Sequence, residues 1–192
     1  SNTVNNANTI PGAMPLGDIA NYKAKLRDPI CNPYRVWLIC GMGPPTSGGV
    51  TIAQILGILQ NFDLPSMEPF SVEAIHLISE ASRLAFADRA TYIADPDFIK
   101  IPILKLVDQA YLKERSKAIS KIKTMGRVKP GLKTANAAPP FPPGINQEGT
   151  STTHMSIIDA NGNVVSMTSS IESRFGSRLM TNGFLLNNQL TD

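Results

Sequence analysis

The hydrophobic pattern of the first 125 residues is mainly helical. Apolar residues recur at helical spacing from Ser71 to about Ala94, where Ser71 is a good N-cap and Glu73 lies in the first turn. Asp95 and Pro96 then end the helix. The same spacing predicts three further helices, over residues 18–26, from residue 49 or 51 to residue 59, and from residue 102 to about residue 123.

One segment breaks this helical pattern. Residues 35–42 are apolar on both faces and rich in β-forming side chains, which predicts a strand that is buried from both sides. The glycines and prolines that follow predict a tight turn before the next helix. Cys31 and Cys40 can form at most one bridge, which leaves the redox compartment open. We expect Cys40 to be a buried apolar residue rather than a redox centre.

The pattern changes after residue 125. Residues 126–150 contain five prolines and four glycines, which predicts a long mobile linker. The texture then becomes typical of β-strands over residues 153–159 and 164–170, on either side of an Asn-Gly turn at residues 160–163, which is typical of a β-hairpin. A third short strand is predicted over residues 183–187. The chain is therefore expected to be helical before the linker and β-rich after it.

Composition excludes several classes of protein. With 192 residues, 42% hydrophobic and 17% charged, the chain is too apolar for general disorder, and two cysteines cannot make a disulfide-dense mini-protein. The longest wholly apolar run, residues 36–40, is far shorter than the roughly 20 residues of a membrane helix. A net charge of +3 does not indicate a nucleic-acid binder. The first residues carry no targeting signal and the last follow a strand-like run, so we expect a fragment of a longer protein.

Three local features have a plain structural interpretation. The glycine-rich turn at residues 41–49 lacks the lysine of a phosphate-binding loop, and its prolines remove amide donors. His76 and His154 are the only histidines and have no carboxylates at ligand spacing, so we expect neither a metal nor a cofactor, and His76 should be a bonded histidine at the edge of the core. The eight Lys and Arg of residues 113–133 favour a solvated face over an anionic partner.

The most informative stretch is a cluster of hydroxyl side chains at residues 149–154, where the linker meets the first strand of the hairpin. One interpretation is a polar turn with β-favouring threonines. The other is a threonine whose peptide bond is broken by its own hydroxyl, so that it becomes an N-terminal nucleophile. The freed α-amine, with a pKa of about 8, then acts as the base beside the hydroxyl.

The residues in and around this cluster resemble the γ-glutamyltranspeptidase family. The small-subunit start of that family is similar to Thr152-Thr153-His154-Met155-Ser156, Asp159, Gly162-Asn163, Ser166, Phe175-Gly176 and Leu185-Leu186-Asn187-Asn188-Gln189. The C-terminal half of its large subunit is similar, in the same order, to Asn21-Tyr22-Lys23, Pro33-Tyr34-Arg35, Pro44-Pro45-Thr46-Ser47-Gly48-Gly49, Gln54-Ile55-Leu56 and Ala87-Asp88-Arg89. The resemblance runs over nearly the whole chain.

The resemblance implies an α/β (α+β) N-terminal-nucleophile hydrolase, an αββα sandwich that is incomplete in this chain. Autocleavage between Ser151 and Thr152 would separate a mostly helical large-subunit part (residues 1–125) and a linker (126–151) from the start of the small subunit (152–192). The partners would then be the large and small subunits of one precursor. Bacterial members are exported to the periplasm or the medium, which suggests the same localisation here.

The activity implied is γ-glutamyl transfer and hydrolysis on glutathione and other γ-glutamyl amides. Thr152 would attack the γ-amide carbonyl, and water or the amine of an amino acid or dipeptide acceptor would resolve the γ-glutamyl ester. By position in the family motifs, Thr153 would bond near the new amine and Ser170 would hold the nucleophile's hydroxyl. The donor's α-amino and α-carboxylate groups would be held by Glu172, Gln189 and Asp192.

Departures from the family leave alternatives open. Many members have Asn at the position of Glu172 and Thr at that of Ser170, which puts donor preference in doubt. The family's carboxylate-binding Arg and its Gly-Gly oxyanion hole lie outside this chain, so the chain alone is expected to be inactive. A cephalosporin (glutaryl) acylase-like amidase is a second candidate, although Asp192 would find no ammonium on a glutaryl group. A third is an unprocessed scaffold or binding module without enzymatic activity.

Overall fold

The computed structural model describes residues 15–132 and 152–188. The chain divides into two compact units, which we call the helical unit (residues 26–145) and the hairpin unit (residues 1–25 and 146–192). Each unit contains helices and strands, so the protein is of mixed α and β type. Within the described residues no helix is long and apolar enough to cross a membrane.

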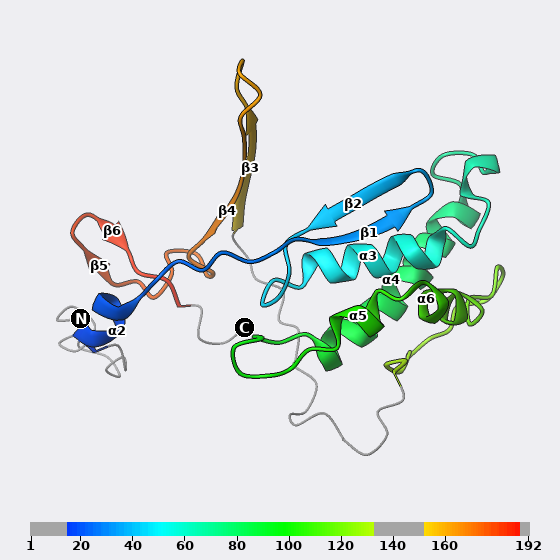
Figure 1. Ribbon diagram of the computed structural model, residues 1–192, viewed down its shortest axis with the longest axis horizontal. Helices are drawn as coiled ribbons and strands as arrows, with labels where there is room; N and C mark the ends of the chain where they lie inside the picture. Colours follow the sequence, from blue (N-terminus) through cyan, green and yellow to red (C-terminus); the bar gives the residue numbers. More distant parts are fainter. Residues whose placement is uncertain (1–14, 133–151, 189–192) are drawn as a thin grey trace. The chain divides into compact units, whose positions relative to one another are not determined.

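The helical unit is built around the helix α3 (Gly48–Leu59). This helix contacts the strands β1 (Ile30–Tyr34) and β2 (Trp37–Gly41) and the helices α5 (Ile103–Leu106) and α6 (Gln109–Ser116). Its most extensive partner is the long helix α4 (Val72–Tyr92). A short 3₁₀ helix, η1 (Leu64–Ser66), lies between α3 and α4 in the sequence. Figure 1 shows the β1–β2 hairpin running along α3.

Two buried clusters hold these elements together, one toward each end of α3. Val50 and Ala53, near the start of α3, pack with Leu106 and Val107. The second cluster joins the end of α3 to α4, α6 and the turn after α6, and consists of Ile58, Leu59, Leu77, Ala81, Leu84, Leu112 and Ile119. A Cβ at Gly57 would collide with the Leu112 side chain, so glycine lets α6 approach α3 closely.

The predicted helix after Ser71 is confirmed. The Ser71 hydroxyl accepts a hydrogen bond from the backbone N–H of Ala74 at 3.2 Å, and the helix runs to Tyr92. The helix predicted from residue 49 or 51 is confirmed as α3. His76 is half-buried and its Nε2 lies 2.7 Å from the carbonyl oxygen of Ser120, as expected for a bonded histidine at the core edge.

The single buried strand predicted over residues 35–42 is wrong. Arg35 adopts a positive φ of 55° and begins a tight turn between β1 and β2, which pair as an antiparallel hairpin. Val36 at this turn is 87% exposed, so these apolar side chains are not buried on both faces. Cys40 is exposed and forms a disulfide with Cys31, which corrects the expectation of a buried apolar cysteine.

Two predicted helices have different bounds. The helix expected over residues 102–123 is divided into α5 and α6, because Asp108 acts as an N-cap and accepts a hydrogen bond from Tyr111 N at 2.9 Å. The helix expected over residues 18–26 is α2 (Leu16–Asn21), which ends where the backbone of Tyr22 becomes extended. Both differences arise from local backbone conformations that apolar spacing does not encode.

Part of the predicted mobile linker is bound to the helical unit. Residues 124–132, which we call the anchored segment, contain no helix or strand, and α4 carries two buried carboxylates that bind them. Glu80 accepts hydrogen bonds from Met125 N at 2.8 Å and from the Thr124 hydroxyl at 2.9 Å. Burial alone would raise the pKa of Glu80, but these hydrogen bonds and the charge of Arg83 outweigh burial and hold the pKa below its usual value.

Asp88 binds the far end of the anchored segment. Its carboxylate accepts hydrogen bonds from Gly131 N at 2.8 Å, from the Tyr111 hydroxyl at 2.5 Å and from Gln54 Nε2 at 3.0 Å, and Arg115 lies 3.4 Å away. Burial of Tyr111 and its hydrogen bond to Asp88 raise the pKa of Tyr111 far above its usual value, so its hydroxyl remains a donor. Residues 126–132 are therefore held in place, while residues 133–150 of the predicted linker lie outside the described residues.

Over residues 15–25 and 152–188, the hairpin unit contains α2 and four strands. The predicted hairpin is confirmed: β3 (Thr152–Ile158) pairs antiparallel with β4 (Val164–Ser170). In the turn, Asp159 accepts hydrogen bonds from the side chain and backbone of Asn163 and from Asn161 N, which hold the pKa of Asp159 below its usual value. The third predicted strand is present in shorter form, as β6 (Phe184–Leu185) paired with β5 (Met180–Thr181).

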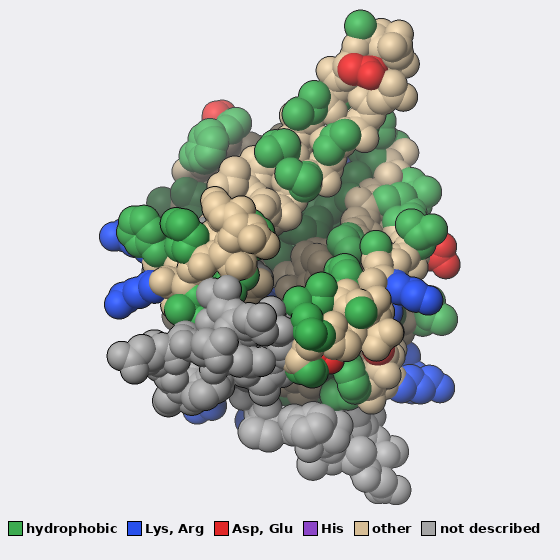
Figure 2. Space-filling view, turned by 90° about the vertical axis from the view of Figure 1, so that its left-hand side faces the viewer, with side chains coloured by type: hydrophobic (Ala, Val, Ile, Leu, Met, Phe, Trp, Pro, Cys, Tyr) green, Lys and Arg blue, Asp and Glu red, His purple; other side chains and the backbone are tan. Residues whose placement is uncertain are grey.

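Neither face of the β3–β4 hairpin is covered. One face carries hydroxyl and imidazole side chains, and the other carries the apolar residues Met155, Ile157, Val165 and Met167, all of which are exposed. Figure 2 shows hydrophobic side chains on the surface of this hairpin, at the top of the view. Among the described residues the strands form three separate two-stranded sheets, so the stacked sheets of the αββα sandwich remain a prediction.

Candidate functional site

Thr152 and Ser170 face each other at the open end of the β3–β4 hairpin. Thr152 is the first residue of β3 and pairs in register with Ser170, the last residue of β4. The Thr152 hydroxyl donates a hydrogen bond to Ser170 Oγ at 3.3 Å. Ser170 Oγ also accepts one from the backbone N–H of Glu172 at 2.9 Å. The hydroxyl predicted to be a nucleophile therefore contacts the hydroxyl predicted to hold it.

A shallow hollow of about 300 Å³ lies over this pair. It is lined by Thr152, Thr153, Ser169, Ser170 and Ile171. Ser169 and Ile171 were not predicted from the sequence, because a serine next to a serine and an isoleucine after a strand carry no signal of their own. The lining residues offer hydroxyl groups and no ionisable side chain. They can therefore orient a polar group by hydrogen bonds, but they place no charge beside it.

Two further predicted site residues, Thr153 and Glu172, lie near the hydroxyl pair in the sequence. Thr153 pairs with Ser169, so alternation along the strand puts its side chain on the opposite face of the hairpin from Thr152. Glu172 is half-buried just beyond β4, in a backbone conformation with φ of 66° that non-glycine residues rarely adopt. Ser151, Gln189 and Asp192 lie outside the described residues, so their predicted roles stay predictions.

His154 adds a polar network that the sequence analysis did not predict. It lies on the same face as Thr152, and its Nδ1 is 2.8 Å from the hydroxyl of Thr168 across the hairpin. Its Nε2 is 3.2 Å from Ser156 Oγ and 3.3 Å from Ser166 Oγ. The period-two alternation of residues 152, 154 and 156 could have indicated this shared face.

The geometry limits how the Thr152 hydroxyl can be activated. Its hydrogen-bond partner is the hydroxyl of Ser170, which is a poor base. The ring nitrogens of His154 contact other hydroxyl groups, those of Thr168, Ser156 and Ser166. A base supplied by Thr152 itself, its α-amine after cleavage, fits this arrangement better than a separate histidine.

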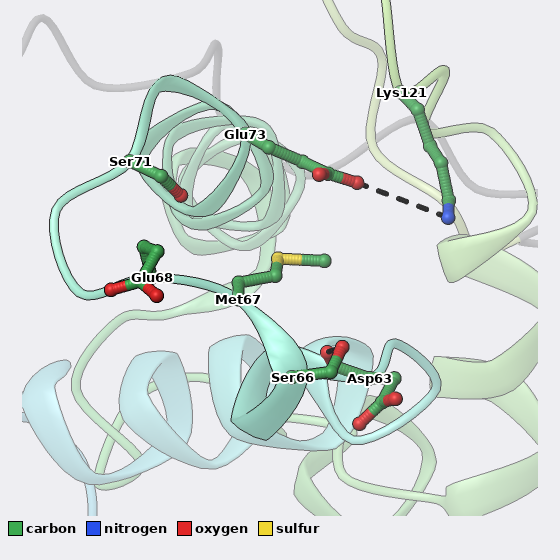
Figure 3. Close-up of a pocket in the computed structure, with 7 residues that line it drawn as sticks. All are labelled: Asp63, Ser66, Met67, Glu68, Ser71, Glu73 and Lys121. Atoms are coloured by element: carbon green, nitrogen blue, oxygen red, sulfur yellow. Dashed lines mark hydrogen bonds and ion pairs between the residues drawn. The ribbon is translucent and has the colours of Figure 1, made fainter.

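A second hollow lies in the helical unit, between η1, the start of α4 and Lys121. It has a volume of about 470 Å³ and is lined by Asp63, Ser66, Met67, Glu68, Ser71, Glu73 and Lys121. Lys121 Nζ points toward Glu73 and lies 3.9 Å from its carboxylate (Figure 3). None of the residues predicted from the sequence to form the site lies here. Within residues 15–132 and 152–188, no three His, Cys, Asp or Glu side chains form a group that could hold a metal ion.

Comparison with known sequences identifies clear relatives. The family model described as gamma-glutamyltranspeptidase matches residues 2–192. The glutathione hydrolase proenzyme of Escherichia coli (strain K12) is 38% identical over 185 residues, which cover 94% of this chain and 30% of that protein. The acylase ACY 1 proenzyme of Pseudomonas sp. (strain SE83) is 39% identical over 181 residues, which cover 93% of this chain and 30% of that protein. The chain thus spans about 30% of the length of these relatives.

The chain also resembles solved structures in its fold. Gamma-glutamyltranspeptidase from Helicobacter pylori matches with a TM-score of 0.62 and 35% identity, covering 66% of this chain and 37% of that one. Cephalosporin acylase from Bacillus halodurans matches with a TM-score of 0.71, covering 90% of this chain and 28% of that one. At 24% identity, this second likeness is one of fold alone.

Proposed function

Because the chain belongs to the gamma-glutamyltranspeptidase family, as its motifs predict, we propose that it is part of a precursor that cleaves itself between Ser151 and Thr152. Thr152 then serves as an N-terminal nucleophile in γ-glutamyl hydrolysis and transfer. The observation that carries the proposal is the Thr152 hydroxyl at the first position of β3, hydrogen-bonded to Ser170 across the strand pair. A nucleophile at a strand end is held by the strand and still open to a substrate.

The proposed reaction divides acyl transfer into two steps. The freed α-amine of Thr152 takes the hydroxyl proton while the oxygen bonds to the γ-carbonyl carbon of the donor, and the leaving amine departs with that proton. Water or an acceptor amine then attacks the γ-glutamyl ester and restores the hydroxyl. Glutathione hydrolase proenzymes among the relatives support glutathione as donor.

The remaining residues have supporting roles in this proposal. Ser170 orients the Thr152 hydroxyl, and Thr153 bonds near the new α-amine. Glu172 and Asp192 bind the donor's ammonium, and Gln189 assists in binding its α-amino and α-carboxylate groups. The fold proposed for the whole precursor is the αββα sandwich, with residues 1–125 in the large subunit, 126–151 as the linker and 152–192 at the start of the small subunit.

We also propose export to the periplasm or the medium. The disulfide between Cys31 and Cys40 supports this localisation, because disulfides persist in oxidising compartments and are rare in the cytosol. A periplasmic or secreted enzyme would meet glutathione outside the cytoplasm.

Intact-mass measurement of the full-length precursor tests the cleavage. We expect two chains, one of which begins at Thr152. Thr152→Ala should give a single chain, whereas Thr152→Ser should retain some cleavage, because a serine hydroxyl can undergo the same N-to-O acyl shift. Cleavage of the Thr152→Ala variant at the same bond would refute the proposal.

A glutaryl acylase is the second candidate, because an acylase proenzyme is as similar to this chain as a glutathione hydrolase proenzyme. The two activities differ in whether the donor carries an ammonium group. We expect Asp192→Ala to lower kcat/KM for a γ-glutamyl anilide about 30-fold or more and to affect a glutaryl anilide far less, since the latter has no ammonium to lose. Equal losses on both donors would favour the acylase.

A further inference from the structure

The disulfide of the helical unit joins the two strands of one exposed hairpin. Cys31 and Cys40 are directly opposite each other in the β1–β2 hairpin, and the bridge spans a sequence separation of 9. Both cysteines are exposed, and neither belongs to the two buried clusters of the helical unit. An attacking thiolate can therefore approach this bridge from solvent.

The surroundings of the two cysteines differ. A hollow of about 150 Å³ is lined by Cys40 together with Ile39, Gly41, Gly48, Gly49, Ile52 and Ala53, but not by Cys31. The backbone at Gly41 touches the first turn of α3, because a Cβ placed there would be 2.8 Å from the Cα of Gly49. Cys40 therefore lies beside the start of a helix of 12 residues, while Cys31 lies on the neighbouring strand.

The start of α3 favours negative charge near Cys40. Its N-cap, Ser47, gives the helix no side-chain cap, because the Ser47 hydroxyl instead accepts a hydrogen bond from Arg89 Nε at 2.8 Å. The first turn of α3 therefore lacks a side-chain cap and lies beside Cys40, and a helix N-terminus stabilises a thiolate. Of the two sulfur atoms, that of Cys40 is the better leaving group.

We infer that the Cys31–Cys40 bridge is a site of thiol–disulfide exchange with small thiols of the glutathione type. The thiolate attacks Sγ of Cys31, a mixed disulfide forms there, and Cys40 leaves as a thiolate. A second thiol then attacks the mixed disulfide, which yields the oxidised small-molecule disulfide and Cys31 as a thiol, so two electrons pass to the bridge. The exchange itself is independent of the proposed acyl transfer, and only the choice of glutathione as the thiol rests on that function.

Exchange at this position would loosen one hairpin and leave the helical core in place. Two-stranded hairpins are marginally stable alone, and the bridge restricts the unfolded ensemble of β1 and β2. Arg35, in the turn of that hairpin, provides a direct readout because trypsin can cut after it only when the turn opens. We expect reduction to raise the rate of tryptic cleavage at Arg35 roughly tenfold or more.

The experiment uses the full-length protein and its Thr152→Ala variant, treated with glutathione buffers of graded reduced-to-oxidised ratio. After acid quenching and alkylation, peptide mass spectrometry measures the bridge, the thiols and the glutathione adduct. We expect a graded loss of the bridge, with the adduct on Cys31, and the same result in both proteins. An adduct on Cys40, or a bridge that persists when the buffer is fully reduced, would overturn the inference, whereas failure of the acyl-transfer proposal would leave this result unchanged.

Single-cysteine variants test the asymmetry directly. Cys31→Ser leaves Cys40 alone and Cys40→Ser leaves Cys31 alone, so each thiol can be titrated by its rate of alkylation against pH. We expect the midpoint for Cys40 to lie about one pH unit below that for Cys31. Equal midpoints, or a lower one for Cys31, would overturn the assigned direction of attack. Exchange measured on the wild-type bridge does not depend on either variant folding.

Discussion

The helical unit and the hairpin unit bury very different shares of their side chains. Two clusters of buried aliphatic residues link the helices of the first, and two buried carboxylates bind the anchored segment to α4. In the second, Gly176 is the only buried residue among those that the structure describes. Yet the candidate nucleophile and its neighbouring hydroxyl belong to the hairpin unit.

The buried residues that stabilise the chain and the candidate catalytic residues therefore lie in different units. Substitutions inside the helical unit should change its free energy of unfolding, because they remove buried contacts. Substitutions in the hairpin should change processing with little effect on the unfolding of the helical unit. The matched relatives are about three times as long as this chain.

The largest effect is expected at Asp88. Asp88→Ala removes the acceptor for Gly131, Tyr111 and Gln54 and leaves the half-buried guanidinium of Arg115 without its carboxylate. We expect the free energy of unfolding of the helical unit to fall by about 3 to 5 kcal/mol.

Urea unfolding followed by circular dichroism measures this loss. The control is Glu114→Ala, which removes the exposed ion pair with Lys117 and should cost less than about 1 kcal/mol. Equal, small losses for both variants would show that the anchored segment does not stabilise the unit.

A pair of aliphatic truncations compares the two units directly. Leu84 is 1% exposed in the second core cluster, so Leu84→Ala should cost about 2 to 4 kcal/mol. Ile157 is 54% exposed on the hairpin, and Ile157→Ala should change the unfolding free energy of this chain by less than about 0.5 kcal/mol. A loss at Ile157 comparable to that at Leu84 would contradict the exposed hairpin.

Periodic segments could be predicted from the sequence, and side-chain contacts over long sequence distances could not. Helical spacing and the Ser71 cap identify α4, and β-like segments on either side of an Asn-Gly turn identify β3 and β4. The β1–β2 turn was missed because Arg35 and Val36 are not turn-forming residues, yet Arg35 adopts a positive φ. The α5–α6 boundary had a signal in Asp108, a favoured N-cap within an apolar pattern.

The anchored segment shows why composition misleads here. Prolines and glycines indicate a lack of regular structure, which is correct for residues 126–132, but they do not indicate mobility. Carboxylates more than 40 positions earlier bind this segment, and no local pattern reports such contacts. For the candidate site, family motifs identified Thr152 and Ser170, which the structure brings together, whereas the network around His154 follows only from strand register.

Ser170 provides a smaller effect, in the hairpin unit. Ser170→Ala removes the partner of the Thr152 hydroxyl and should slow self-cleavage of the full-length precursor by about five- to tenfold, the equivalent of one neutral hydrogen bond. Time courses of precursor loss measure the rate. Ser166→Ala, on the same strand and face but near His154, is the matched control and should leave the rate within about twofold. Similar slowing in both variants would indicate a general effect on the hairpin.

The smallest effect is the dependence of stability on pH through Glu80. Its pKa is lower in the folded chain than in the unfolded chain, so the unfolded chain binds more protons in acid. The stabilisation is therefore fully present above the unfolded pKa of about 4.3 and is lost as the pH falls through the lower folded pKa. Glu80→Gln keeps the shape and removes the charge. We expect it to cost about 1 kcal/mol at pH 7, and this difference from the wild type should shrink as the pH falls below the unfolded pKa, as measured by urea unfolding at a series of acidic pH values. A difference that stays constant with pH would mean that the charge of Glu80 does not stabilise the anchored segment.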